Sequence, residues 1–159
     1  AAFETVQNRN TPVLSWFQDI FIYDLYWQKT AKRPHHHTAP SQQYYGLLAA
    51  LRHIMSVGIE NAWNQHQEIH HYFAQEMESR GWKFFVSSEN RLPQLNTVLL
   101  PEGFDDMANR SLLREKFNIE VGGGLGAMAG KLWRIGIMGG NVNRVAVDEL
   151  LKAIDSLSK

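Results

Sequence analysis

A glycine-dense stretch at residues 121–139 restricts the fold of this chain more than any other segment. Glycines stand at positions 122, 123, 124, 126 and 130, and the run that follows, residues 131–138, is mostly apolar. Glycine has no Cβ, so it lets other groups come close to the backbone and accepts tight turns. A short apolar run bounded by glycines is typical of a buried strand. The segment therefore predicts a tight loop leading into a short strand.

This strand carries Arg134 in its middle. Removing a guanidinium from water is unfavourable unless an anion pairs with it, and its planar fork of donors matches a carboxylate. The anion is either an internal Asp or Glu or a bound ligand. Composition and spacing alone favour the first reading, with residues 122–126 as a flexible hairpin.

The glycines do not form a common phosphate-binding motif. No Ser or Thr follows the Gly130-Lys131 pair, so the P-loop pattern is absent. A dinucleotide fingerprint would need a third glycine where Ala127 stands, and a long helix after it. The glycine loop is therefore not assigned to phosphate binding, and its expected role is to let backbone approach whatever group Arg134 binds.

Composition excludes several classes of protein. The 159 residues are 44% hydrophobic and 20% charged, as in a globular domain. The formal net charge is zero, which gives no electrostatic footprint for nucleic acid or an anionic membrane, and no apolar run reaches membrane-spanning length. The absence of cysteine excludes disulfides and thiolate chemistry and fits a reducing compartment.

The first half of the chain shows helical periodicity. Residues 2–9 predict a short helix, and residues 16–26 predict a second, with Ser15 as its N-cap. Residues 41–80 form the longest helical region, with a break at Gly58 and an end at Gly81.

Two groups of histidines raise the question of metal binding. His66 and His70 are spaced i, i+4, but a solvated helix face explains them better. His35, His36 and His37 lie between two prolines in extended chain, where adjacent side chains point to opposite sides. We therefore predict no metal site, and we read this second group as a loop that presents imidazole and hydroxyl groups to an anion.

From residue 82 the period changes to that of strands. The expected order is strand, strand, helix, strand, strand, helix, which is an α+β fold: a few-stranded, mostly antiparallel sheet covered by helices, preceded by a long connecting helix. Asp105 or Asp106 caps the first of these helices. The predicted elements are strands at 82–86, 95–100, 119–121 and 131–138, and helices at 107–117 and 141–157.

Four motifs occur in the same order in this chain as in one known family of enzymes. The chain resembles the C-terminal part of the alanine–glyoxylate and serine–pyruvate aminotransferases, which are class V, fold-type I enzymes that depend on pyridoxal 5'-phosphate. The resemblance covers essentially the whole chain. The motifs are His36-His37-Thr38-Ala39-Pro40, Arg91-Leu92-Pro93 with Asn96-Thr97-Val98, Ile119-Glu120-Val121-Gly122-Gly123-Gly124-Leu125-Gly126, and Gly130-Lys131-Leu132-Trp133-Arg134-Ile135-Gly136-Ile137-Met138-Gly139.

The resemblance implies roles for three residues. Arg134 stands where the family binds the α-carboxylate of the amino-acid substrate, and the same arginine would bind the 2-oxo acid. The segment His35-His36-His37-Thr38 stands where the family reaches across a dimer interface to the cofactor phosphate of the neighbouring subunit, and His35 and Thr38 are the implied phosphate contacts. His35 replaces the usual Tyr, so the donor there is an imidazole with a different reach and pH dependence.

The resemblance also implies that no catalytic residue lies in this chain. The family's Schiff-base lysine lies upstream of the segment with which the chain begins, and none of the seven lysines sits in its motif. The implied division is a tail of the large cofactor-binding domain at 1–45, a connecting helical region at 46–81 and a small α+β domain at 82–159. The implied partners are the upstream large domain and a second subunit in a homodimer.

The sequence is also compatible with other functions. The chain is alternatively a catalytically silent fragment that acts as a dimerisation or binding module. Phosphoserine aminotransferase and kynureninase are related fold-type I activities, whereas a desulfurase nucleophile is excluded because cysteine is absent. The expected location is cytoplasmic, or peroxisomal if one more Leu follows Ser158-Lys159 and completes a Ser-Lys-Leu address.

Overall fold

A computed structural model describes residues 2–27 and 35–157 of the chain. It divides the chain into two compact units, Ala1–Leu51 and Arg52–Lys159, with the boundary inside a long helix.

The first unit contains two short helices and the start of a longer one. They are α1 (Ala2–Gln7), α2 (Ile20–Trp27) and α3 (Ser41–Val57), with a single 3-10 turn at Trp16–Gln18. The predicted helix at 16–26 with Ser15 as N-cap is wrong in its beginning, because the Ser15 side chain makes no capping bond. Asp19 interrupts the segment in an extended conformation, and its carboxylate accepts a hydrogen bond from the Phe21 N–H at 3.0 Å. That bond satisfies a free amide of the first turn of α2.

The long helical region breaks at Gly58, as predicted. Gly58 has φ of +88°, a conformation that favours glycine, and separates α3 from α4 (Ile59–Ser79). Gly81 follows α4 with φ of +83°, as expected just beyond a helix end. No residue of α3 is buried, and several large apolar side chains along α3 are exposed: Tyr44, Tyr45, Leu47, Leu48, Leu51, Ile54 and Met55.

The second unit is built on a four-stranded antiparallel sheet in the order β1-β2-β4-β3. This confirms the predicted α+β fold and the predicted order of strands and helices. The strands are β1 (Lys83–Phe84), β2 (Leu95–Leu99), β3 (Gly122–Gly123) and β4 (Leu132–Gly136), and the helices besides α4 are α5 (Asp106–Phe117) and α6 (Arg144–Asp155).

The third strand lies later in the sequence than predicted. Residues 119–121 follow α5, and Asn118 turns the chain there with φ of +55°. The Ile119 N–H bonds to the Leu113 carbonyl at the end of α5, so this segment closes the helix. Pairing with β4 begins only at Gly122 and Gly123, where sequence preference for a strand is low.

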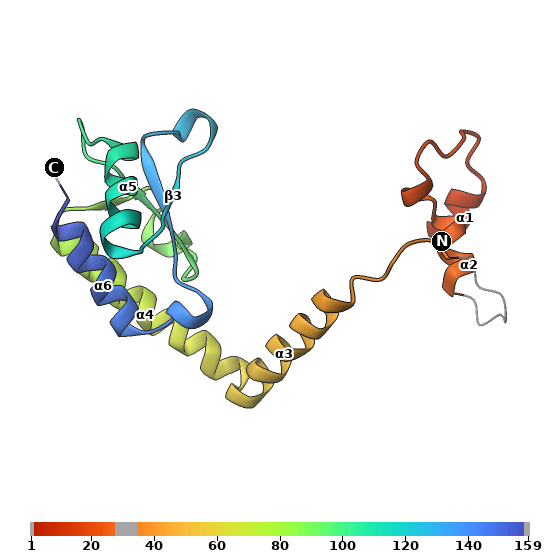
Figure 1. Ribbon diagram of the computed structural model, residues 1–159, viewed down its shortest axis with the longest axis horizontal. Coiled ribbons are helices and arrows are strands. Elements are labelled where there is room, and N and C mark those ends of the chain that lie inside the picture. The colour runs from red at the N-terminus through yellow and green to blue at the C-terminus, as the bar shows by residue number, and fades with distance from the viewer. Residues whose placement is uncertain (1, 28–34, 158–159) are drawn as a thin grey trace. The chain divides into compact units, whose positions relative to one another are not determined.

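The core lies between one face of the sheet and the helices. Val98, Trp133 and Ile135 point into it from the central strands, and Phe73 and Met77 meet them from α4. Figure 1 shows α4 and α6 side by side along the lower left of this unit, and their residues are in contact. Because side chains alternate along a strand and Trp133 and Ile135 face the core, Arg134 points to the opposite face of β4.

Side-chain caps begin two of these helices. The Asp105 carboxylate accepts from the Ala108 N–H at 2.9 Å, which confirms Asp105 as the cap of α5. Asn143 caps α6 through the Ala146 N–H, also at 2.9 Å. Among the described residues, no helix has the length and hydropathy needed to cross a bilayer.

Candidate functional site

Arg134 lies in the middle of β4, between two neighbouring strands. Its backbone is in register with Thr97 of β2 and Gly122 of β3. The side chain is half-buried, and its Nε donates a hydrogen bond to the Gly123 carbonyl at 2.8 Å. Within residues 52–157, no carboxylate oxygen lies within 4.0 Å of this guanidinium. The described part of the second unit thus offers no internal acid to neutralise Arg134.

The glycines of β3 lie against guanidinium groups on both faces of the strand. A Cβ built on Gly122 would be 3.4 Å from the Arg134 terminal nitrogen Nη2. A Cβ on Gly123 would be 3.4 Å from the Arg110 guanidinium carbon, on the other face. An added Cβ at either position would be in ordinary van der Waals contact with a guanidinium, and a longer side chain would compete with that guanidinium for space. Two cations thus lie close to one piece of backbone, one on each face of β3.

Arg110 belongs to a hydrogen-bonded group that the sequence analysis did not identify. Its Nε and Nη2 bond to the two oxygens of Asp106 at 2.8 and 3.2 Å, which is a bidentate pair. The buried Trp133 donates its indole N–H to Asp106 Oδ1 at 2.7 Å. The Arg110 bond lowers the pKa of the Asp106 carboxyl, and the indole N–H adds to this effect. The i, i+4 spacing was the available signal for the ion pair, whereas nothing local connects Asp106 with Trp133.

The histidine loop of the first unit is ordered around His36. This imidazole is 1% exposed and stacks on Trp16, with ring centroids 4.1 Å apart and planes 7° apart. Its Nε2 lies 3.1 Å from the Trp16 carbonyl, and its Nδ1 lies 2.8 Å from His37 Nδ1. Because a carbonyl only accepts, the neutral His36 ring carries its proton on Nε2 and accepts from His37. His35 and Thr38, the two predicted phosphate contacts, flank this fixed pair and are exposed.

His70 is not on a solvated helix face, so that prediction is wrong. It is 5% exposed in α4, and burial lowers the pKa of its imidazole. It lies near Asn96 of the sheet, and in the part of the chain that the structure describes neither His70 Nδ1 nor Asn96 Oδ1, both buried, has a hydrogen-bond partner within standard geometry. Helical spacing placed this residue among polar neighbours, and only packing against the sheet buries it.

Arg91 and Thr97 of the second motif differ in their hydrogen bonding and ion pairing. Arg91 lies over the Phe84 ring at 4.1 Å and pairs with Glu78 at 2.8 Å. The Thr97 hydroxyl, opposite Arg134 in the ladder, is buried and has no hydrogen-bond partner among the described residues.

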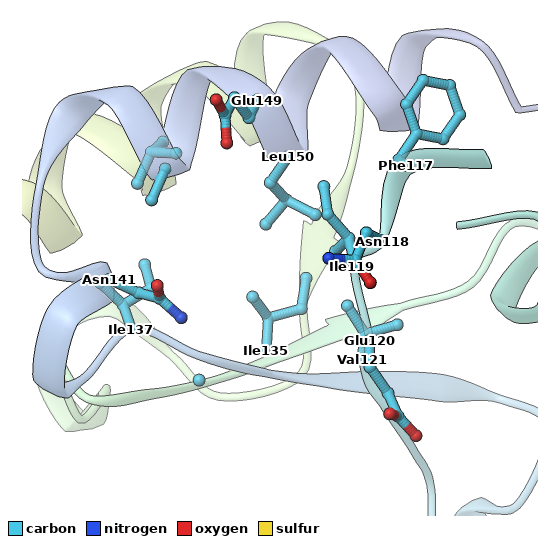
Figure 2. A pocket seen from close by; sticks show the side chains of 13 residues that line it. Phe117, Asn118, Ile119, Glu120, Val121, Ile135, Ile137, Asn141, Glu149 and Leu150 are labelled. Carbon is cyan, nitrogen blue, oxygen red and sulfur yellow. The ribbon is translucent and has the colours of Figure 1, made fainter. Parts of the chain in front are cut away.

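A cavity of about 300 Å³ lies between α6, residues 117–121 and the C-terminal end of β4. Leu150 and Ile135 face each other across it, and Glu149 lies above it on α6 (Figure 2). Arg134 does not line this cavity, so the half-buried arginine and the cavity are separate features. Among the described residues, no group of three His, Asp or Glu side chains is placed to hold a metal ion.

Three comparisons relate the chain to known proteins. The family model of class-V aminotransferases matches residues 14–139. The alanine–glyoxylate aminotransferase of Callithrix jacchus is 35% identical over 151 residues, which are 94% of this chain and 36% of that protein. The (S)-ureidoglycine–glyoxylate transaminase of Bacillus subtilis (strain 168) is 28% identical over 148 residues, which are 93% of this chain and 35% of that protein.

A solved structure matches the arrangement of the chain as well as its sequence. The crystal structure of an alanine–glyoxylate aminotransferase from Nostoc sp. aligns with a TM-score of 0.83 and 43% identity. The alignment covers 97% of this chain and 40% of that one. The chain thus spans between 35% and 40% of the length of these three relatives.

Proposed function

Since the chain belongs to the class-V aminotransferase family, we propose that it is the C-terminal portion of a pyridoxal-phosphate-dependent aminotransferase. The proposed reaction moves the amino group of alanine or serine to glyoxylate or pyruvate. The names of the relatives support the choice of glyoxylate as an acceptor. The observation that carries the proposal is Arg134, a half-buried cation in a central strand with no carboxylate partner among the described residues.

Arg134 would bind the carboxylate that the amino acid and the oxo acid share. Its Nε is already bonded to the Gly123 carbonyl, so the two terminal nitrogens are the donors that remain. They match the two oxygens of a carboxylate in an end-on, bidentate contact. Because both substrates carry this group at the same place, one arginine would orient both halves of the exchange.

The described residues fit the phosphate of the cofactor through donors on the histidine loop. His35 and Thr38 offer an imidazole and a hydroxyl, and both are exposed on either side of the ordered His36–His37 pair. We propose that they contact the phosphate bound by a neighbouring subunit. The chemistry supplied by bound pyridoxal phosphate is a carbonyl that exchanges amino groups and a sink for electrons. The lysine that this chemistry needs is expected upstream of this chain.

The proposed division into 1–45, 46–81 and 82–159 goes with this role. The exposed apolar side chains of α3 would be covered by the large domain and the second subunit of a homodimer, since a contiguous apolar surface of this kind marks an interaction site.

Substitution of Arg134 by Ala in the complete enzyme tests the proposal. We expect KM to rise for both the amino acid and the oxo acid, with a loss of roughly 2–5 kcal/mol in transition-state binding, which is roughly 30-fold to several-thousand-fold in kcat/KM. Arg114→Ala is the control, because Arg114 is an exposed arginine on α5. Equal kinetics for the two variants would refute the assignment of Arg134.

The exposed surface of α3 also suits a second function, that of a catalytically silent dimerisation or binding module. Absorbance with added pyridoxal phosphate, followed by borohydride reduction and mass analysis, separates the two. A reducible adduct on one lysine of this chain would contradict an upstream lysine. Activity that appears only when an upstream segment is supplied would support the proposed enzyme, and its absence from every such combination would favour the silent module.

A further inference from the structure

We propose that Asp106, Arg110 and Trp133 are positioning residues for Arg134, acting through the backbone of Gly123. This inference rests on the proposed role of Arg134 as the carboxylate-binding residue. The three side chains lie on the face of β3 opposite to Arg134. They would hold the peptide whose carbonyl orients the arginine.

The first step is that these three side chains hold one another in a single arrangement. The Asp106–Arg110 pair uses both carboxylate oxygens, and bidentate geometry fixes direction as well as distance. Trp133 is fully buried, and its indole N–H bonds to the same carboxylate. Asp106 stands in the first turn of α5, next to the Asp105 cap, so the group is anchored to the start of a helix.

This group meets Gly123 at two points. The Arg110 guanidinium carbon lies 3.4 Å from the place where a Gly123 Cβ would be, so its plane lies against the strand. Trp133 is the register partner of Gly123 across the β3–β4 ladder. A glycine pair has little conformational preference of its own, so contacts on either side determine where its peptides point.

Gly123 is in turn bonded to the arginine. The Gly123 carbonyl accepts the Nε–H of Arg134 at 2.8 Å, the one hydrogen bond that orients this guanidinium within the described residues. Arg134 also follows Trp133 directly in β4, so the residue whose indole bonds to Asp106 is adjacent in sequence to the arginine. A shift of Gly123 would therefore turn the two terminal nitrogens away from a bound carboxylate. Because Arg110 already neutralises Asp106, this group can orient Arg134 without Asp106 forming an ion pair with Arg134 itself.

The first experiment measures steady-state kinetics of the complete enzyme with alanine and glyoxylate. We expect Arg110→Ala and Asp106→Asn to raise KM for both substrates, by roughly 10- to 100-fold, because misplacement by about 1 Å has effects of that order. The fall in kcat should be much smaller than the rise in KM. Asp106→Asn keeps an acceptor for the Trp133 N–H, so it retains the core contact if Arg110→Ala folds poorly. Arg114→Ala, on the same helix, should match the wild type.

The second experiment repeats both substitutions in an Arg134→Ala background. If Asp106 and Arg110 act through Arg134, their effect on KM disappears when Arg134 is absent. A purely structural role would leave the same loss in both backgrounds, and that result would overturn the inference. Unchanged KM in Arg110→Ala and Asp106→Asn would overturn it as well. If Arg134→Ala itself leaves KM unchanged, the proposed function fails first, which distinguishes the two failures.

Discussion

Gly124→Ala is expected to damage the turn that leads into β4. A Cβ on Gly124 would lie 1.9 Å from the Met128 carbonyl oxygen and 2.6 Å from its carbon, whereas Cβ atoms essentially never approach other atoms closer than 3.0 Å. The Met128 carbonyl must therefore retreat by about 1 Å, and no flexible side chain is present to absorb the movement. The same oxygen accepts the Lys131 N–H at 3.1 Å, and this hydrogen bond would be lost.

The expected loss follows from these two effects. A lost hydrogen bond contributes about 0.5–1.5 kcal/mol and a strained backbone about 1–3 kcal/mol, so we expect roughly 2–4 kcal/mol less free energy of unfolding. Urea denaturation of the 159-residue chain measures it, as a lower midpoint with an unchanged slope. KM should also rise in the complete enzyme, since the turn continues from the glycines beside Arg134.

Gly140→Ala is the matched control for this prediction. Nothing lies within 4 Å of a Cβ at Gly140, and its φ is not in the left-handed region. We expect its midpoint to stay close to that of the wild type. If Gly124→Ala and Gly140→Ala shift the midpoint by the same amount, the close approach at Met128 does not explain the glycine at 124.

Two further predictions concern the core over the sheet. Burial lowers the pKa of His70 below 6.5, so the unfolded chain binds this proton more tightly than the folded chain does. The neutral ring therefore contributes stability above pH 6.5, and this contribution is lost as the pH falls toward the folded-state pKa. His70→Gln should flatten the fall in the urea midpoint below about pH 6.5, whereas the exposed His53→Gln should not; parallel pH curves for the two would refute this. Phe73→Ala, at a fully buried position of α4, should remove about 3–5 kcal/mol of stability. The exposed Gln75→Ala on the same helix should change it little, and a small loss for Phe73→Ala would show that the core can collapse around the missing ring.

The most accurate sequence-based predictions concerned features that depend on neighbours in the chain. Gly58 interrupts the long helical region and Gly81 ends it, as predicted from their positions in the helical pattern. Both have a positive φ, which glycine adopts far more readily than other residues. Asp105 caps α5 because its side chain reaches an amide only three residues away. The order of strands and helices in the second unit follows in the same way from the change of hydrophobic period at residue 82.

The prediction for Arg134 began from one residue in an apolar run. Composition and spacing favoured an internal acid as its partner, but no carboxylate of the second unit lies within 4.0 Å of the guanidinium. A bound carboxylate as the partner of Arg134 therefore stays a prediction. The bond to Gly123 and the pair of guanidinium groups on either side of β3 were not predicted, because they join residues that are far apart in sequence.

The errors share one physical origin, which is competition between local preference and distant partners. Residues 119–121 have the apolar side chains of a strand, but their backbone closes α5 and the ladder forms at the glycines that meet β4. His70 has polar neighbours along the helix but packs on the sheet beside Asn96. Patterns of a few residues describe which element forms, because backbone geometry and capping are local. Which face is buried, and which donor meets which acceptor across 27 residues between Asp106 and Trp133, depends on how the elements pack.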